Sequence, residues 1–159
     1  MHGDGLYEGT IWQYRWFVPH DFDWVIATLG SKKKVLSELD YFFENNLFNM
    51  GNQPDMHVPF LYYYLGAPWK TQKLVHQILL EPTTNYYGTH EKWEKPYIGK
   101  IFNTTPQGYL KEMDDDAGTM SSWFVLSSIG LFPVCPGIPY YWINAPVFDC
   151  LLYTSDAAD

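Results

Sequence analysis

The stretch SKKKVLSELDYFFENN, residues 31–46, has the pattern of an amphipathic helix. Ser31 can cap a helix, because its side-chain oxygen accepts a hydrogen bond from a backbone amide of the first turn. The three lysines after the cap fit a solvated face. The segment therefore predicts a helix from Ser31 to about Asn46. Its apolar stripe consists of Val35, Leu36, Leu39, Tyr41, Phe42 and Phe43.

Shorter helices are predicted on the N-terminal side of this one. Residues 10–16 lack Gly and Pro and fit one or two helical turns, which Pro19 ends. Asp21 or Asp23 can then cap a short helix that stops before Gly30.

On the C-terminal side, residues 57–65 predict a short aromatic helix. Pro68 suits the first position of the next helix, which runs to about Leu80. Residues 114–116 are three aspartates, and we expect them to open the last helix, which stops at Gly130.

The remaining segments add little regular structure. Residues 81–109 are rich in Pro, Gly, Thr, Asn and Tyr and predict a long loop, whereas residues 140–143 predict a strand. The fold class is therefore mainly α, with about five helices, long loops and a short β segment near the C-terminal end. Stacked helix pairs with functional loops at one end suit a partial (α/α)6 toroid.

The composition excludes several classes of protein. The chain has 159 residues, of which 47% are hydrophobic and 19% aromatic, so it is not a disordered segment. Its formal net charge of −8 argues against nucleic-acid binding, which needs a basic surface. No apolar run approaches the ~20 residues of a membrane span, and no signal peptide is visible.

The last ten residues, CLLYTSDAAD, resemble the translation of a common sequencing adapter. We therefore expect residues 150–159 to be non-native and structurally idle, and residues 1–149 to be the native part of a domain that continues beyond them. Cys135 is the one cysteine of that native part, so neither an intrachain disulfide nor a cysteine metal cage is available.

The first motif is EGTIWQYRWFVPHD, residues 8–21. Apolar neighbours such as Trp12 and Trp16 would raise the pKa of Glu8 by desolvation. Sugar hydrolysis needs a carboxylic acid that stays protonated near neutral pH. The alternative is a surface glutamate that the dipole of a helix start favours.

The second motif is NMGNQPDMH, residues 49–57, in which Gly51 and Pro54 forbid regular structure. Its amide and carbonyl oxygens suit a hard cation such as calcium, which takes oxygen ligands. The alternative is an ordinary turn before the following helix.

The third motif is EMDDDAGTMSSW, residues 112–123. Three successive aspartates repel one another, and a helix N-terminus offsets part of that repulsion. A calcium ion, or a water held by an adjacent base, would also use these acids. Both interpretations stay open at this point.

Together the three motifs resemble glycoside hydrolase family 92, the calcium-dependent exo-α-mannosidases. APWKTQ (residues 67–72) and FPVCPG (residues 132–137) extend the resemblance, which covers residues 5–149. It implies removal of terminal α-linked mannose from glycans, including N-glycans, with inversion. It also implies an N-terminal β-sandwich outside this chain, so the chain alone is expected to be inactive. A secreted or periplasmic location is favoured.

The resemblance also implies individual roles. Glu8 is the general acid, and Asp114 and Asp116 hold the attacking water, with Asp116 the first choice for the base. Ca²⁺ binds the mannose hydroxyls, and Asn52 and Gln53 are its candidate ligands. The substrate-binding residues are expected to be Trp12, Gln13, Arg15, His20, Asp21 and His57.

Some positions depart from the family pattern. The second motif more often reads Gly-Asn-Glu-Pro-Ser-His-His, whereas this chain has Gln53, Asp55 and Met56 in place of Glu, Ser and the first His. These positions are near the leaving-group sugar, so the linkage preference stays open. In the third motif Met113 and Asp114 stand where the family often has Gly-Asn.

Two other functions stay open: another inverting hydrolase on an α/α toroid, which need not use calcium, and a sugar-binding module without catalysis. Inverting glycosidases hold their two carboxyl groups roughly 6.5–9.5 Å apart. We therefore expect Glu8 to face residues 114–116 across an open cleft that Asn52 and Gln53 also line. Carboxyl groups on opposite faces of the fold would instead favour a binding or structural role.

Overall fold

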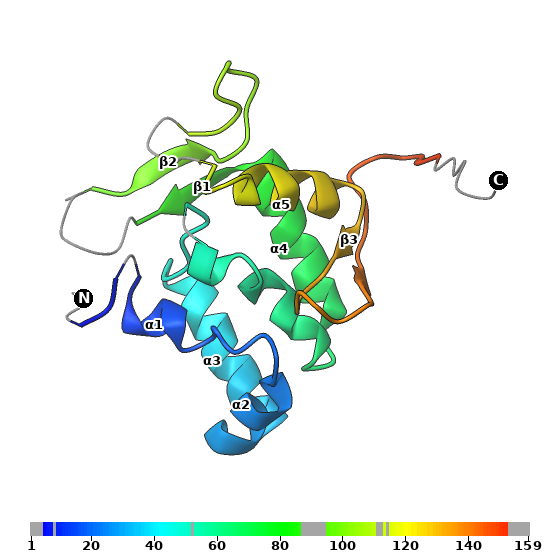
Figure 1. The fold of residues 1–159 in the computed structure, drawn as a ribbon. Helices are drawn as coiled ribbons and strands as arrows, with labels where there is room; N and C mark the ends of the chain where they lie inside the picture. The colour runs from blue at the N-terminus through cyan, green and yellow to red at the C-terminus, as the bar shows by residue number, and fades with distance from the viewer. Residues whose placement is uncertain are drawn as a thin grey trace.

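The computed structural model describes residues 5–7, 9–51, 53–86, 95–110, 113 and 115–152. Over this part the chain is mostly helical, with a few short strands (Figure 1). The helices predicted before residue 46 are confirmed as α1 (Ile11–Tyr14), α2 (Phe22–Leu29) and α3 (Lys32–Glu44). No helix in the described ranges is long and apolar enough to span a membrane.

Side-chain caps explain where α2 and α3 begin. The Asp21 carboxylate accepts a hydrogen bond from the Trp24 backbone N at 2.9 Å. The Ser31 hydroxyl accepts one from the Lys34 backbone N at 3.2 Å. Each cap satisfies an amide that a helix start leaves without an intrahelical partner. The apolar stripe of α3 is buried through Val35, Leu39 and Phe42.

The segment after the second motif is wound more tightly than the sequence predicts. Within the motif lies η1 (Gln53–Asp55), and after it comes η2 (Val58–Tyr63); both are 3₁₀ helices. In η2 the Phe60 backbone N donates to the His57 carbonyl at 3.0 Å, three residues back. Most of η2 is buried, so no amphipathic 3.6-residue stripe selects an α-helix there.

Helix α4 (Pro68–Leu80) has the predicted bounds and packs against η2. Its Thr71 hydroxyl donates to the Pro59 carbonyl of η2 at 2.8 Å, inside the core. Figure 1 shows α4 running through the middle of the molecule, with α5 crossing near one of its ends.

The expected long loop of residues 81–109 is wrong in part. β1 (Pro82–Asn85) and β2 (Tyr97–Lys100) pair as antiparallel strands, with Pro82 opposite Lys100. A further antiparallel bridge joins Phe102 and Tyr109. Each strand has only four residues, which is too short for a clear period-2 signal in the sequence, so pairing with the other strand stabilises its structure.

The last helix also begins later than predicted. α5 (Thr119–Ser128) starts after a turn in which Asp116, Ala117 and Gly118 have φ values of 43°, 59° and 86°. Left-handed residues cannot continue a right-handed helix. The described aspartates, Asp115 and Asp116, therefore precede α5 instead of opening it.

Two short strands complete the described chain. β3 (Leu131–Phe132) pairs in antiparallel fashion with β4 (Trp142–Ile143), which lies within the predicted strand. Gly130 joins α5 to β3 with φ 82°, and a Cβ at this position would lie 2.5 Å from the Asn144 carbonyl oxygen. A glycine is required there because both its conformation and its contact exclude a side chain.

One buried apolar cluster joins α2, α3, η2, α4 and α5. Outside it, several large apolar side chains remain exposed on the helices and strands. They include Trp24, Trp69, Ile98, Val125 and Ile143. Cys150, Leu151 and Leu152 are also exposed, and residues 153–159 lie outside the described part.

Candidate active site

The first motif forms α1 through a reciprocal cap. The Thr10 backbone N donates to the Gln13 side-chain oxygen at 2.6 Å, and the Gln13 backbone N donates to the Thr10 hydroxyl at 3.3 Å. The Gln13 side chain is 1% exposed, so its amide nitrogen, Nε2, needs a partner inside the protein. Glu8, the predicted acid, lies outside the described residues.

Asp55 of the second motif is the hydrogen-bond partner of the Gln13 amide nitrogen. Its Oδ2 accepts hydrogen bonds from the Gln13 Nε2 at 2.9 Å and from the Asn49 backbone N at 2.7 Å. Its side chain is 0% exposed, and among the described residues its Oδ1 has no hydrogen-bond partner. Burial raises the pKa of Asp55 to about 8, although the two hydrogen bonds act in the opposite direction.

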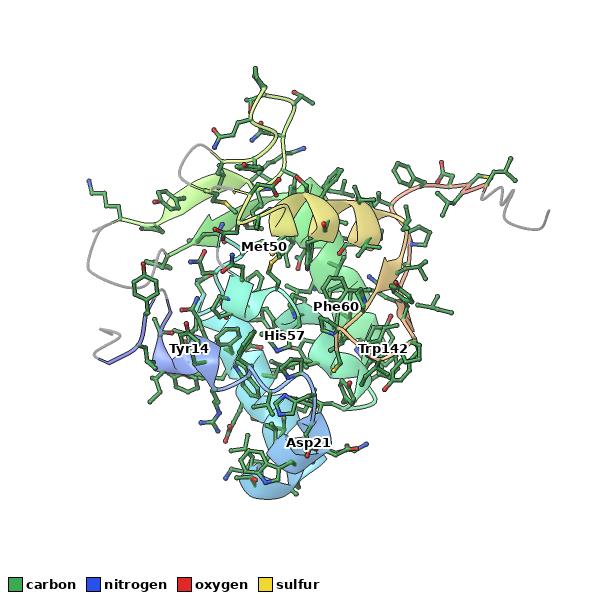
Figure 2. All side chains as sticks on the ribbon, viewed as in Figure 1. Tyr14, Asp21, Met50, His57, Phe60 and Trp142 are labelled. Carbon is green, nitrogen blue, oxygen red and sulfur yellow. The ribbon has the colours of Figure 1, made fainter. Side chains whose placement is uncertain are left out.

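His57 makes a second link between the first and second motifs. Its Nε2 lies 2.7 Å from the Trp16 carbonyl oxygen, and because a carbonyl accepts, Nε2 is the donor. The ring meets Phe17 edge to face at 5.6 Å and is 6% exposed. Burial lowers the pKa of His57 below 6.5. Figure 2 labels His57 near the middle of the view and Asp21 near α2.

The second motif also contacts the third. The Trp123 indole N–H on α5 donates to the Met56 carbonyl at 2.8 Å, in the core. A Cβ on Gly51 would lie 3.3 Å from Cγ of Met113, so that side chain packs directly over the second motif. Residues 49–57 therefore contact both other motifs, although 27 residues separate the first motif from the second and 54 separate the second from the third.

Within the third motif the two described aspartates differ. Asp115 accepts a hydrogen bond from the Ser121 backbone N at 2.8 Å and another from the Ser121 hydroxyl at 2.7 Å. These bonds lower the pKa of Asp115, which lies at the surface. Asp116 is partly exposed, and its carbonyl accepts from the Thr119 hydroxyl. Asp114 lies outside the described residues.

The other predicted substrate-binding residues lie along the outer part of the first motif. The Trp12 ring packs on Tyr41 at 5.4 Å. Arg15 forms an ion pair with Glu38 of α3. His20 and Asp21 are exposed, and Asp21 caps α2 as described above.

The donor chemistry of the second motif fits a hard cation. Gln53 is exposed at the start of η1, where it offers an amide oxygen. Asp55 is committed to Gln13 and Asn49, so the motif offers amide and backbone oxygens more readily than its carboxylate. Asn52 lies outside the described residues. Within those residues no group of three or more His, Cys, Asp or Glu could hold a metal ion.

A separate hollow of about 580 Å³ lies beside β2, between Tyr97 and Tyr109. Two amide side chains that line it make hydrogen bonds within the protein. The Asn103 Oδ1 accepts from the Thr105 backbone N at 2.9 Å, and the Gln107 Nε2 donates to the Met113 carbonyl at 2.9 Å. Gln107 therefore links the lining of this hollow to Met113 of the third motif.

Sequence reasoning missed the residues that join the motifs: Asp55, Asn49 and Trp123. Asp55 stood out only as a departure from the family's serine, and Trp123 is buried in the core, 1% exposed. The polar partner of each lies more than forty positions away in the chain or is a backbone atom. Periodicity and spacing carry no signal for such contacts.

A mostly helical fold that joins acid-bearing motifs at one polar loop is an arrangement that a two-carboxylate glycoside hydrolase can use. A family model described as the glycosyl hydrolase family 92 catalytic domain matches residues 1–92 and 83–157. The chain belongs to glycosyl hydrolase family 92.

Solved structures agree with this assignment. The family 92 glycosyl hydrolase ccman5 matches with a TM-score of 0.83 and 32% identity, over 91% of this chain and 21% of that one. A family 92 α-mannosidase of Bacteroides thetaiotaomicron matches with a TM-score of 0.66 and 32% identity, over 88% of this chain and 17% of that one. The complex of the same enzyme with mannoimidazole gives 0.68 and 28%, over 87% and 17%.

A protein of Arthroderma benhamiae described as an uncharacterized secreted glycosidase is 34% identical over 145 residues. The match covers 91% of this chain and 16% of that protein. The chain therefore spans about a fifth or less of the length of each of these relatives.

Proposed function

We propose that this chain is part of the catalytic domain of an exo-α-mannosidase that removes terminal α-linked mannose from glycans with inversion. The observation that carries the proposal is the convergence of the first and third motifs on residues 49–57. Gln13 and His57 make the contacts on one side, and Met56 with Trp123 makes them on the other. Membership of family 92 and the named α-mannosidases among its structural neighbours supply the substrate class.

In the proposed reaction, Glu8 donates its proton to the glycosidic oxygen as the bond from that oxygen to the anomeric carbon breaks. A water molecule attacks the anomeric carbon from the opposite face and gives its proton to Asp116. The choice of Asp116 as the base follows from the family resemblance. The Asp115 carboxylate accepts hydrogen bonds from Ser121, and Asp116 occupies the turn before α5. Asp114 would help to hold the water.

Substrate contacts are assigned to the first motif. Trp12, Arg15, His20 and Asp21 retain some exposure and are proposed to bind the sugar or its leaving group. Gln13 and His57 are buried, so their proposed contribution acts through the second motif that they hold. The family's common Glu, Ser and His are replaced in that motif, which leaves the preferred linkage to experiment.

Asn52 and Gln53 are proposed as ligands of Ca²⁺, together with backbone oxygens of the second motif. When bound, calcium would supply a positive charge that grips the mannose hydroxyls and favours ring distortion. The exposed amide at Gln53 supports this assignment through its donor type.

The rest of the enzyme is proposed to lie outside these residues. The family fold suggests a partial (α/α)6 toroid here, with residues 1–149 as part of that domain, a β-sandwich elsewhere in the protein and residues 150–159 as non-native. Exposed apolar side chains such as Trp24 and Trp69 offer surfaces for neighbouring helices. Secretion is proposed because the Arthroderma benhamiae relative is described as secreted.

The test uses the full-length enzyme that contains this chain. Glu8→Gln should abolish cleavage of an α-mannobiose, whose leaving group needs a proton. It should spare α-mannosyl fluoride, whose leaving group needs none. Asp116→Asn should abolish both reactions, and chelation should abolish activity that added calcium restores. A wild-type enzyme that binds mannosides but cleaves neither substrate would refute the proposal and favour a binding module.

A further inference from the structure

Asp55 is a buried carboxyl group to which the proposed reaction gives no role. A carboxyl group is costly to bury, and this one is 0% exposed. Both of its hydrogen bonds converge on Oδ2, one from a side chain of α1 and one from the backbone of the second motif. The group therefore acts as a clamp between two motifs.

The clamp reaches α1 at the residue that organises it. Gln13 uses its side-chain oxygen to cap the Thr10 amide at 2.6 Å and its side-chain nitrogen to bind Asp55 at 2.9 Å. Because both ends of the amide are engaged, a shift of Asp55 moves the start of α1. Buried hydrogen-bond networks of this kind are rigid only when every member is present.

The clamp also reaches the turn of the second motif. The Asn49 backbone N donates to Asp55, and the Asn49 side-chain oxygen accepts from the Gly51 backbone N at 2.9 Å. Asp55 thus fixes the path of residues 49–51 from inside the loop. α1 and this turn share one acceptor atom, so their relative position depends on it.

We propose that Asp55 is a positioning residue that sets the first motif against the second, so that the acid reaches the leaving-group oxygen in register with the sugar. The inference rests on the proposed function, in which Glu8, two residues before Thr10, is that acid. Because the Asp55 side chain is 0% exposed, its proposed effect acts through the residues that it holds. A misplacement of about 1 Å is enough to reduce a rate by ~100-fold.

Three variants of the full-length enzyme separate positioning from stability. Asp55→Ala removes the acceptor of both hydrogen bonds. Gln13→Met removes the side-chain amide that donates to Asp55, with little change in side-chain volume. Asp55→Asn keeps an oxygen where Oδ2 lies and so keeps both hydrogen bonds. Asp40→Asn is the matched control. Asp40 lies on α3 and accepts hydrogen bonds from Lys70 and Tyr62, away from the Asp55 clamp.

The readout is the ratio of kcat for an α-mannobiose to kcat for α-mannosyl fluoride, measured at a temperature where circular dichroism shows each variant folded. We expect Asp55→Ala and Gln13→Met each to lower this ratio by about 10–100-fold, with KM changed less than about threefold. The double variant should lose no more than either single one. Asp55→Asn and Asp40→Asn should stay within about threefold of wild type.

An unchanged ratio in both folded single variants would overturn the positioning role while leaving the mannosidase proposal intact. Equal losses on the two substrates would also overturn it, because a general structural defect does not distinguish leaving groups. If either variant fails to fold, the other decides the question. A wild-type enzyme that cleaves neither substrate would instead refute the proposed function.

Discussion

The second and third motifs both present aspartates, and the fold treats them in opposite ways. Asp55 is fully buried and bonded to Gln13, 42 positions away, and its pKa is raised to about 8. Asp115 lies at the surface, is bonded to Ser121 six positions away, and has a lowered pKa. A buried acid that accepts bonds from two segments can hold those segments together, whereas a partly exposed acid keeps contact with solvent. The surroundings of each aspartate, more than its motif, set its role.

The largest effect should be the difference between the two described aspartates of the third motif. Asp116→Asn should lower kcat of the full-length enzyme by about 10²–10⁴-fold, the usual contribution of a general base. Asp115→Asn keeps an acceptor for the Ser121 amide and should stay within about threefold. Mannoside hydrolysis by the purified variants measures both. Equal losses in the two variants would remove the distinction between these neighbours.

The next largest effect should come from Trp123, which joins the third motif to the second. Trp123→Ala removes the hydrogen bond to Met56 and a ring stacked on Phe102 at 5.9 Å, and it should destabilise the protein by about 3–5 kcal/mol. Trp123→Phe keeps a ring but leaves the Met56 carbonyl unpaired, at about 1–3 kcal/mol. Chemical denaturation monitored by circular dichroism gives both values. Identical stability of the alanine variant would show that the second and third motifs are not held through this residue.

The amino-acid sequence predicts the helices of this chain better than it predicts the contacts of the second and third motifs. The sequence predicts the helices, because caps such as Ser31 and apolar spacing act within one element. It does not predict the Asp55–Gln13 bond, since burial of the Asp55 carboxyl group in η1 depends on how η1 packs against α1. The turn at Asp116 was also missed, because three acids before a helix ordinarily lie in its first turn. Here Gly118 and two left-handed residues delay the helix. The paired strands β1 and β2 depend on each other more than on local propensity.

A smaller effect concerns the backbone of the third motif. Gly118 has φ 86° with open space around its Cα, so Gly118→Ala meets only backbone strain, about 1–2 kcal/mol. Ala117→Gly relieves similar strain at φ 59° and should leave the melting temperature unchanged or slightly higher. Thermal unfolding of the two variants checks the pair. A destabilising Ala117→Gly together with a neutral Gly118→Ala would contradict the left-handed turn.

The smallest expected effect is a difference in pH dependence. Burial lowers the pKa of His57 below its unfolded value of 6.5, so the native state binds fewer protons there. This contribution to stability is present above pH 6.5 and is lost as the pH falls through the folded pKa. Asp115, with a pKa lowered from 3.8, loses its contribution only at more acidic pH. His57→Gln, which keeps a donor for the Trp16 carbonyl, should flatten the fall in melting temperature just below pH 6.5, and an unchanged curve would contradict the assignment.

The central claim is that the three motifs form one acid–base site for single-step hydrolysis of α-mannosides. Proton NMR of the full-length enzyme acting on an α-mannoside, recorded before mutarotation, tests it most directly. Single-step inversion predicts β-mannose as the first product, because water attacks the face opposite the leaving group while two carboxyl groups roughly 6.5–9.5 Å apart act as acid and base. Initial release of α-mannose would mean retention through a covalent intermediate and would refute single-step inversion.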